Sequence, residues 1–303
     1  MLEILIKSFA FLAIILLGHL LRRLHFFEES DFHVLSKIVL KITLPATIIS
    51  NFTGNRLQIS MLLLTLIGFG CGALMILTAI ISTFGQSAEH RALYVLCVPG
   101  FNIGNFTLPF VQSFLGPAGV IATSIFDVGN AFICLGGTYG IASALKNDHS
   151  EFSWGLLPKM LFRSVPFDAY LVMAILSFCG LALPSPLIAV AGIIGNANPF
   201  LAMLMIGVGF RLSSDRNQAL KIIKILGIHY GVAIFAAILI FLFLPFPLEY
   251  RQTLTLLVLS PIASAAPAFA AELGCDFGLA SAASSISILI SIFLITATLI
   301  IIL

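Results

Sequence analysis

Long hydrophobic runs separated by short polar segments dominate the chain. Ten runs, each about as long as a membrane-spanning helix, follow one another through the sequence. They occupy residues 2–21, 34–53, 60–84, 92–114, 117–145, 165–183, 187–210, 218–244, 252–272 and 277–302. The runs are continuous and do not alternate, which predicts helices, because a helix satisfies its own backbone hydrogen bonds within the bilayer. We therefore expect an all-α polytopic membrane protein with ten transmembrane helices.

Composition supports this interpretation. Of the 303 residues, 60% are hydrophobic and only 9% are charged, with a mean hydropathy of +1.13. Such a chain has too little polar surface to cover a soluble globule, so the lipid bilayer is its expected surrounding. The net charge of +2 gives no reason to expect a nucleic acid partner.

A polar stretch at 146–151 divides the runs into two groups of five. We expect a first five-helix repeat at 1–145, a cytoplasmic linker at 146–164 and a second repeat at 165–303. Landmarks recur in the same order in both halves: Pro45 and Pro199, Glu89-x-Arg91 and Glu249-x-Arg251, and Pro109 and Pro267, each seven residues before a glycine. Because five is odd, repeated landmarks lie on opposite membrane sides, which predicts an inverted repeat.

Basic residues predict the orientation in the membrane. Twelve of the fifteen lysines and arginines fall on the side that follows the first, third, fifth and seventh runs, and the other side holds Lys7, Arg56 and Arg251. Basic residues are enriched in cytoplasmic loops. We therefore expect a protein of the cell membrane with both termini on the non-cytoplasmic side.

Two of the runs contain polar interruptions in matching places. The fourth run carries Phe101-Asn102-Ile103-Gly104-Asn105-Phe106-Thr107-Leu108-Pro109, and the ninth carries Ser260-Pro261-Ile262-Ala263-Ser264-Ala265-Ala266-Pro267. Proline lacks an amide donor and glycine weakens helices, so both helices are expected to break. A simple kink is the alternative, but the coincidence of two breaks favours a binding site.

If the breaks cross, the N-termini of two half-helices bring positive partial charge into one small volume, which suits an anion. The predicted substrate-binding residues are Asn102, Gly104, Asn105, Pro109, Pro261, Ser264 and Pro267.

Ionisable residues within the runs are candidates for ion coupling. Asp127 is the carboxylate placed deepest, and Asn130 lies on the same helical face, so the pair can hold a cation or pass a proton. A structural hydrogen bond is the alternative for Asp127. His229 lies near the middle of the eighth run; a proton-coupling role is weighed against a hydrogen-bonded packing role, which is favoured. No metal or cofactor is expected beyond a coupling Na⁺ or H⁺.

Four motifs at these positions resemble the auxin efflux carrier family in its short prokaryotic form. They are Gly18-x-x-Leu21-Arg22-Arg23, Lys41-Ile42-Thr43-Leu44-Pro45, Asn102-x-Gly104-Asn105-x-x-Leu108-Pro109 and Ala265-Ala266-Pro267-Ala268. Thr107 and Phe269 depart from residues frequent in relatives and are expected to reshape the pocket.

The resemblance implies ten spans in two inverted repeats, with spans four and nine broken and crossing. It implies a scaffold of spans 1, 2, 6 and 7 and a transport domain of spans 3–5 and 8–10 that moves like an elevator. It further implies a homodimer, a malate- or malonate-like substrate, and contact between Asn102 and the substrate carboxylate.

The leading hypothesis is therefore a secondary transporter for a small organic anion. A sodium or proton antiporter on the same fold and a membrane receptor that binds ligand without transport are the alternatives. The sequence contains no nucleophile elbow, zinc-helix signature, phosphate loop or dinucleotide fingerprint, so an enzyme is not expected.

Overall fold

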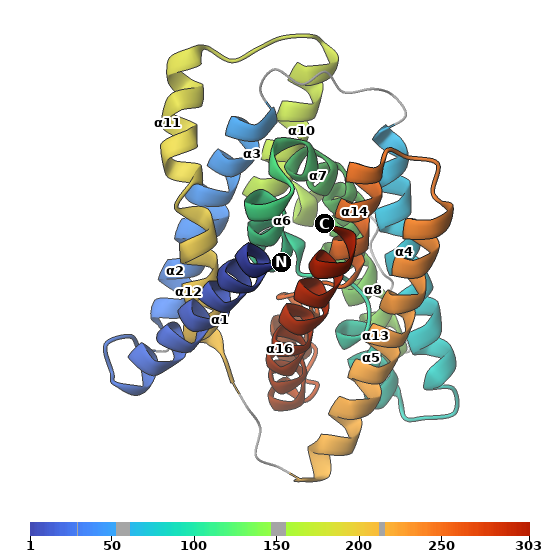
Figure 1. Cartoon of the computed structure of the whole chain (residues 1–303). Helices are drawn as coiled ribbons and strands as arrows, with labels where there is room; N and C mark the ends of the chain where they lie inside the picture. Colours follow the sequence, from blue (N-terminus) through green and yellow to red (C-terminus); the bar gives the residue numbers. More distant parts are fainter. Residues whose placement is uncertain (29, 53–60, 147–155, 212–215) are drawn as a thin grey trace.

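The computed structural model describes the whole chain except residues 29, 53–60, 147–155 and 212–215 (Figure 1). The regular structure of the described residues is helical. The α-helices, with π-helical segments marked η, are α1 (Leu2–Arg23), α2 (Asp31–Ile38), η1 (Val39–Thr43), α3 (Leu44–Phe52), α4 (Leu62–Ser82), α5 (Ala88–Cys97), η3 (Ile103–Thr107), α6 (Leu108–Phe114), α7 (Gly116–Phe132), η4 (Ile133–Gly137), α8 (Thr138–Lys146), α9 (Leu156–Leu161), α10 (Val165–Phe178), α11 (Ser185–Gly195), α12 (Asn198–Gly209), α13 (Arg216–Phe243), α14 (Leu248–Val258), α15 (Ala266–Glu272) and α16 (Phe277–Ile302).

Each of the ten predicted runs coincides with one helix or with consecutive helices. Seven segments in the described part of the chain are long and apolar enough to cross a membrane, and α10 is a shorter apolar helix of 14 residues. The fourth and ninth runs are interrupted, as the sequence predicts, and each is divided between half-helices. The helical membrane fold is confirmed, whereas the ten-span count with inverted symmetry stays a prediction. Of the expected linker at 146–164, residues 147–155 lie outside the described residues, and α9 occupies Leu156–Leu161.

Large apolar side chains are exposed on the outer faces of the long helices. Phe9 on α1, Leu66 on α4 and Phe293 on α16 are 71%, 65% and 73% exposed. A contiguous surface of this kind is unfavourable in water and favourable against lipid tails. The protein is therefore a multi-pass membrane protein.

Glycines let two pairs of helices approach closely. A Cβ atom added to Gly18 of α1 would lie 2.5 Å from the Leu204 carbonyl oxygen, and one added to Gly207 of α12 would lie 2.1 Å from the Ile15 oxygen. Gly68 and Gly129 do the same for α4 and α7. Such contacts hold membrane helices together, because lipid provides no hydrophobic force between them.

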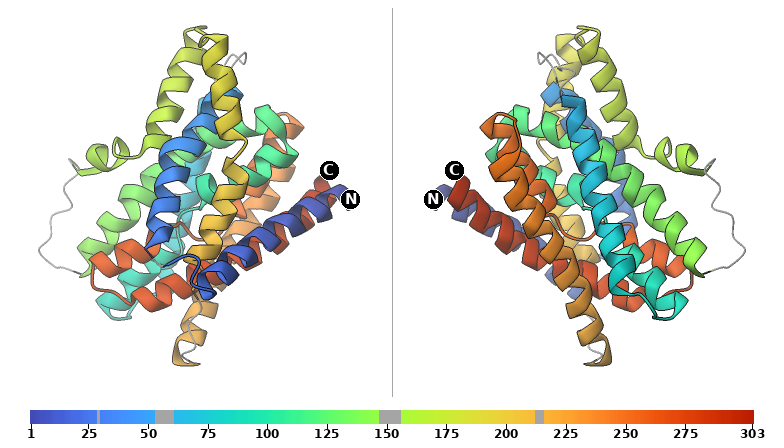
Figure 2. Two further views of the ribbon diagram at one scale, coloured as in Figure 1. Left: turned by 90° about the vertical axis from the view of Figure 1, so that its left-hand side faces the viewer. Right: turned by 90° about the vertical axis from the view of Figure 1, so that its right-hand side faces the viewer.

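The helices fall into two packed groups. In one, α1 packs on α12 and α3 packs on α10 and α11. In the other, α4 and α6 pack on α7, α13 packs on α14 and α15 packs on α16. The groups also contact each other, α3 on α7 and α1 on α16. Figure 2 shows α1 and α16 running side by side, with both chain termini at the same end of the molecule. The two termini thus lie close together, and their orientation relative to the membrane stays a prediction.

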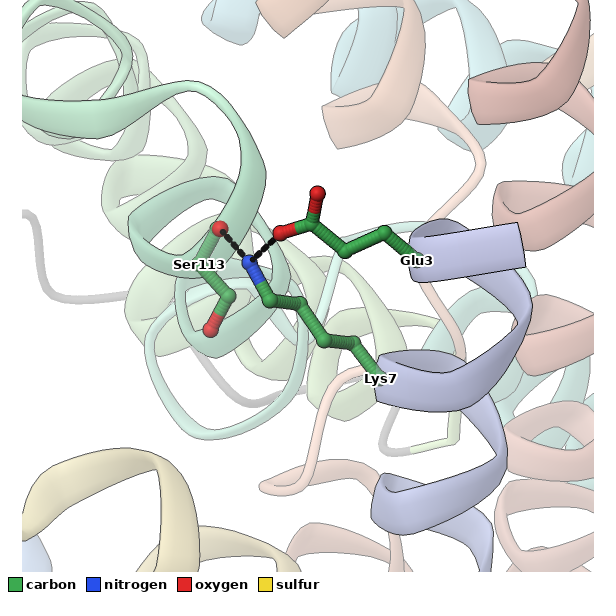
Figure 3. A network of polar contacts seen from close by, with 3 residues as sticks. All are labelled: Glu3, Lys7 and Ser113. Carbon is green, nitrogen blue, oxygen red and sulfur yellow. Dashed lines mark hydrogen bonds and ion pairs between the residues drawn. The ribbon is translucent and has the colours of Figure 1, made fainter. Parts of the chain in front are cut away.

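A polar contact joins α1 to the end of α6 (Figure 3). The Lys7 ammonium lies 2.8 Å from a carboxylate oxygen of Glu3 and donates to the Ser113 carbonyl oxygen at 3.3 Å. A cation at a helix C-terminus pairs with carbonyl groups that have no partner within the helix. Lys7 thus links the first packed group to the second.

Candidate functional site

The first interruption lies between α5 and η3. The helix ends at Cys97, and the chain continues in irregular backbone until Ile103. Gly100 has φ of +85°, a left-handed conformation that side chains other than glycine rarely adopt. A Cβ atom there would also lie 2.6 Å from the Cys134 sulfur. Pro109 lies in the first turn of α6, where its missing amide costs no hydrogen bond.

The second interruption lies between α14 and α15 and contacts the first. Asn102 donates its backbone N–H to the Pro261 carbonyl oxygen at 2.9 Å, and Phe101 and Ile262 form an antiparallel bridge. Pro267 occupies the first turn of α15. The two breaks therefore satisfy part of each other's backbone, which in lipid would otherwise cost several kcal/mol per unpaired group.

Side chains also bond across the two breaks. The hydroxyl oxygens of Thr107 and Ser260 are 2.5 Å apart, and the Asn105 amide donates to the Ser264 hydroxyl at 3.3 Å. The side-chain oxygen of Asn105, Oδ1, is buried and has no hydrogen-bond partner in the described part of the chain. Asn105 therefore keeps one acceptor available beside the crossing.

Asn130 of α7 supports the first break from behind. Its side-chain oxygen accepts the Phe101 N–H at 3.0 Å, and its amide donates to the Phe101 carbonyl at 2.9 Å. The same amide donates to an Asp127 carboxylate oxygen at 2.8 Å. One turn of α7 therefore fixes the broken backbone and orients the Asp127 carboxylate.

Asp127 has a second partner on another helix. The Tyr170 hydroxyl of α10 donates to the other carboxylate oxygen at 3.1 Å. Asp127 is half-buried, whereas Tyr170 is buried. The carboxylate therefore bridges α7, in one packed group, and α10, in the other.

His229 of α13 lies behind the crossing, fully buried. Its Nδ1 is 2.7 Å from the Val98 carbonyl oxygen and its Nε2 is 3.0 Å from the Ser260 carbonyl oxygen. These carbonyls belong to the ends of α5 and α14, so one imidazole touches both breaks. A neutral imidazole donates one hydrogen, whereas an imidazolium donates to both oxygens.

A cavity of about 130 Å³ lies at the breaks, which line it together with residues of α7 and α10. Six of the predicted residues line it: Asn102, Gly104, Asn105, Ser264, Asp127 and Asn130. The other four predicted residues, Pro109, Pro261, Pro267 and His229, do not. The prolines lie in the interrupted segments beside the cavity, and His229 contacts the backbone carbonyl groups of Val98 and Ser260.

Two further expectations are corrected. Thr107 and Phe269 do not line the cavity, because Thr107 points to Ser260 across the breaks and Phe269 packs on Tyr139 with ring centres 5.1 Å apart. Sequence reasoning also missed Tyr170, Cys134 and the break-supporting role of Asn130. The one signal in the sequence that could have indicated Tyr170 is its place as a polar residue within the sixth hydrophobic run.

A helical membrane protein with two interrupted helices meeting at a polar cavity has the architecture of a secondary transporter. Residues 4–153, the first half of the chain, match a family model described as a membrane transport protein. The chain belongs to this family, the auxin efflux carrier family of membrane transporters, as its motifs indicated. A comparison with curated proteins gave no match.

Proposed function

We propose that this transporter carries a small organic anion, of the malate or malonate kind, by an elevator-type alternating-access mechanism across the cytoplasmic membrane. The observation that supports it best is the cavity at the paired breaks, to which both halves of the chain contribute side chains and half-helix N-termini.

The donors around the cavity suit a carboxylate. Asn102 forms no side-chain hydrogen bond with any described residue, so its amide is free to donate to a substrate. The first amides of a helix have no partner within the helix and carry positive partial charge. A volume of about 130 Å³ favours a small carboxylate over a large aromatic acid.

Charge balance supports coupling to a cation. Neither lysine nor arginine is among the described residues that line the cavity, and Asp127 adds a negative charge. An anion entering beside an ionised carboxylate in a low dielectric is repelled unless a proton or Na⁺ neutralises one of them. Asp127 with Asn130 is the proposed coupling site, so transport and ion binding favour each other.

The proposed scaffold is the group of α1, α2, α3, α10, α11 and α12, and the proposed transport domain is the remainder. Side-chain hydrogen bonds between the groups include Lys7 to Ser113 at 3.3 Å, Gln112 to the Gly195 carbonyl at 3.5 Å, and Tyr170 to Asp127. The first two are long, so separating them costs little. The third involves the proposed ion site, so a bound proton or cation weakens a link between the domains.

His229 is the proposed second proton site. Protonation gives it a donor for each of the two carbonyl oxygens, and the C-terminal ends of α5 and α14 favour a positive charge. In its neutral form His229 acts as a packing residue and donates a hydrogen bond to only one of the two carbonyl oxygens.

Uptake of labelled malonate and malate into proteoliposomes tests the substrate class. We expect Asn102→Ala to abolish most of the flux, while Asn196→Ala, which removes an exposed amide outside the cavity, retains it. Absence of carboxylate flux in the wild type, or equal flux in the two variants, would contradict the proposal.

A sodium or proton antiporter is the second candidate, because the cavity contains a carboxylate and no basic side chain among its described residues. It predicts ion flux in liposomes without any added carboxylate, lost in Asp127→Asn. A receptor predicts thermal stabilisation by a carboxylate without flux. A homodimer formed through the scaffold, and termini outside the cytoplasm, complete the proposed arrangement.

A further inference from the structure

A second cleft lies away from the crossing, between the end of α4, the start of α5 and α13. Its volume is about 510 Å³, and it shares no lining residue with the cavity at the breaks. Its walls include Gln86, His90, Tyr94, Lys221, Lys224 and Gly227. Both lysines belong to the basic-rich side of the chain, which is the predicted cytoplasmic side.

Positive charge gathers in this cleft, and none of the described residues that line it is acidic. Lys221 and Lys224 are three residues apart and therefore share a face of α13. Neither forms an ion pair with any described residue. Burial lowers the pKa of His90, and the two nearby lysines lower it further. The neighbouring Glu89 is exposed and does not line the cleft.

A buried hydroxyl group in the cleft is also without a partner. Tyr94 is 2% exposed, and its phenolic oxygen has no hydrogen bond within the described part of the chain. Its ring lies against that of His90, with ring centres 4.6 Å apart. Buried polar groups are nearly always paired, so a ligand that accepts a hydrogen bond here would give the Tyr94 hydroxyl the partner it otherwise lacks.

Exposed apolar side chains lie next to residues that line the cleft in the sequence, and Leu220 itself lines it. Leu220 and Ile223, on α13 beside the lysines, are 69% and 63% exposed, and Phe84 is 84% exposed. A ligand bound to the lysines therefore has its remaining part next to apolar side chains. This suits an amphiphile with an anionic head.

We propose that the cleft binds a phosphate group, supplied by the headgroup of an anionic lipid of the cytoplasmic leaflet. Lys221 and Lys224 pair with the phosphate oxygens, the Tyr94 hydroxyl donates a hydrogen bond, and the acyl chains lie along α13. Basic clefts between membrane helices on this side recognise anionic headgroups by the same chemistry.

Removal of the lysines tests the charge requirement. The full chain in neutral detergent is mixed with phosphatidylglycerol, with phosphatidylcholine, or with inorganic phosphate, and bound lipid is counted by native mass spectrometry. At about 1 kcal/mol for each lysine, Lys221→Gln with Lys224→Gln weakens phosphatidylglycerol binding roughly 30-fold. Lys37→Gln with Lys41→Gln removes two exposed lysines from the same predicted side, outside the cleft, and retains binding.

Filling the cleft tests its position without changing charge. A Cβ atom at Gly227 or at Gly231 meets nothing within 4 Å, and Gly227 alone of the two lines the cleft. Gly227→Leu should therefore weaken phosphatidylglycerol binding, whereas Gly231→Leu should not.

The outcomes separate the sources of the phosphate. Binding of phosphatidylglycerol that depends on both the lysines and Gly227 supports the lipid. Stabilisation by inorganic phosphate with the same dependence, and no lipid retention, supports the phosphate chemistry and overturns the lipid source. Equal binding in the cleft variants and their controls, or no preference over phosphatidylcholine, overturns the site. None of these readouts involves carboxylate transport, so the outcome is independent of the proposed substrate.

Discussion

Asn130 should control the rigidity of the first break, and Asn130→Ala removes that control. The wild-type side chain accepts the Phe101 N–H at 3.0 Å and donates to both the Phe101 carbonyl and Asp127. Alanine preserves the helix, because it has the highest helix propensity. It removes these three bonds and also the bond that the Asn130 oxygen accepts from the Cys134 thiol at 3.2 Å. The variant therefore isolates the support of the broken backbone from the folding of α7.

The expected cost follows from the groups left unpaired. Phe101 is 2% exposed, so its N–H loses a buried partner at about 1–3 kcal/mol. Its carbonyl keeps the Ile103 N–H at 2.9 Å, and Asp127 keeps Tyr170. A local loss of about 2 kcal/mol makes opening of the break roughly 30-fold more frequent.

Hydrogen–deuterium exchange of peptides covering residues 98–105 measures this opening directly. Ser124→Ala is the control, because the Ser124 hydroxyl lies on the same helix and bonds to the Val120 carbonyl of its own helix at 2.8 Å. Exchange in Asn130→Ala that matches the Ser124→Ala control would refute the assigned support.

Two further substitutions test packing and the link between the helix groups. In Gly129→Ala the new Cβ lies 1.9 Å from the Thr65 carbonyl oxygen, so α4 and α7 must separate at a cost of about 1–3 kcal/mol. The control is Gly231→Ala, whose new Cβ meets open space, and equal melting temperatures of the two variants would contradict the prediction. Tyr170→Phe removes the 3.1 Å bond to Asp127 and keeps the ring. The ion concentration for half-maximal transport should shift by about tenfold, equivalent to about 1.4 kcal/mol. An unchanged ion dependence would argue against the link between the helix groups.

The helical fold and the two breaks were predictable because their causes are local. A continuous apolar run forms a helix in lipid whatever its neighbours are, since its backbone has no other donor or acceptor. Proline and glycine interrupt that helix through their own backbone chemistry. For this reason the breaks at 98–102 and 259–265 fall within or beside the predicted stretches.

The membership of the cavity was predictable in part. Asn102, Gly104 and Asn105 lie in one interruption, so their proximity follows from the chain itself. Asp127 and Asn130 were candidates because a carboxylate and an amide one helical turn apart share a face. That they meet the interruption depends on Phe101, which is 29 residues from Asn130.

The sequence by itself determined a helical membrane protein with two broken helices and a set of polar candidates. The tertiary structure decided which polar groups meet: His229 with two break carbonyls, Tyr170 with Asp127, and Thr107 with Ser260 instead of the cavity. Apolar periodicity carries no record of these pairs, because each joins helices far apart in the chain. Such contacts are set by how the glycine-lined helices pack, and packing depends on the whole bundle.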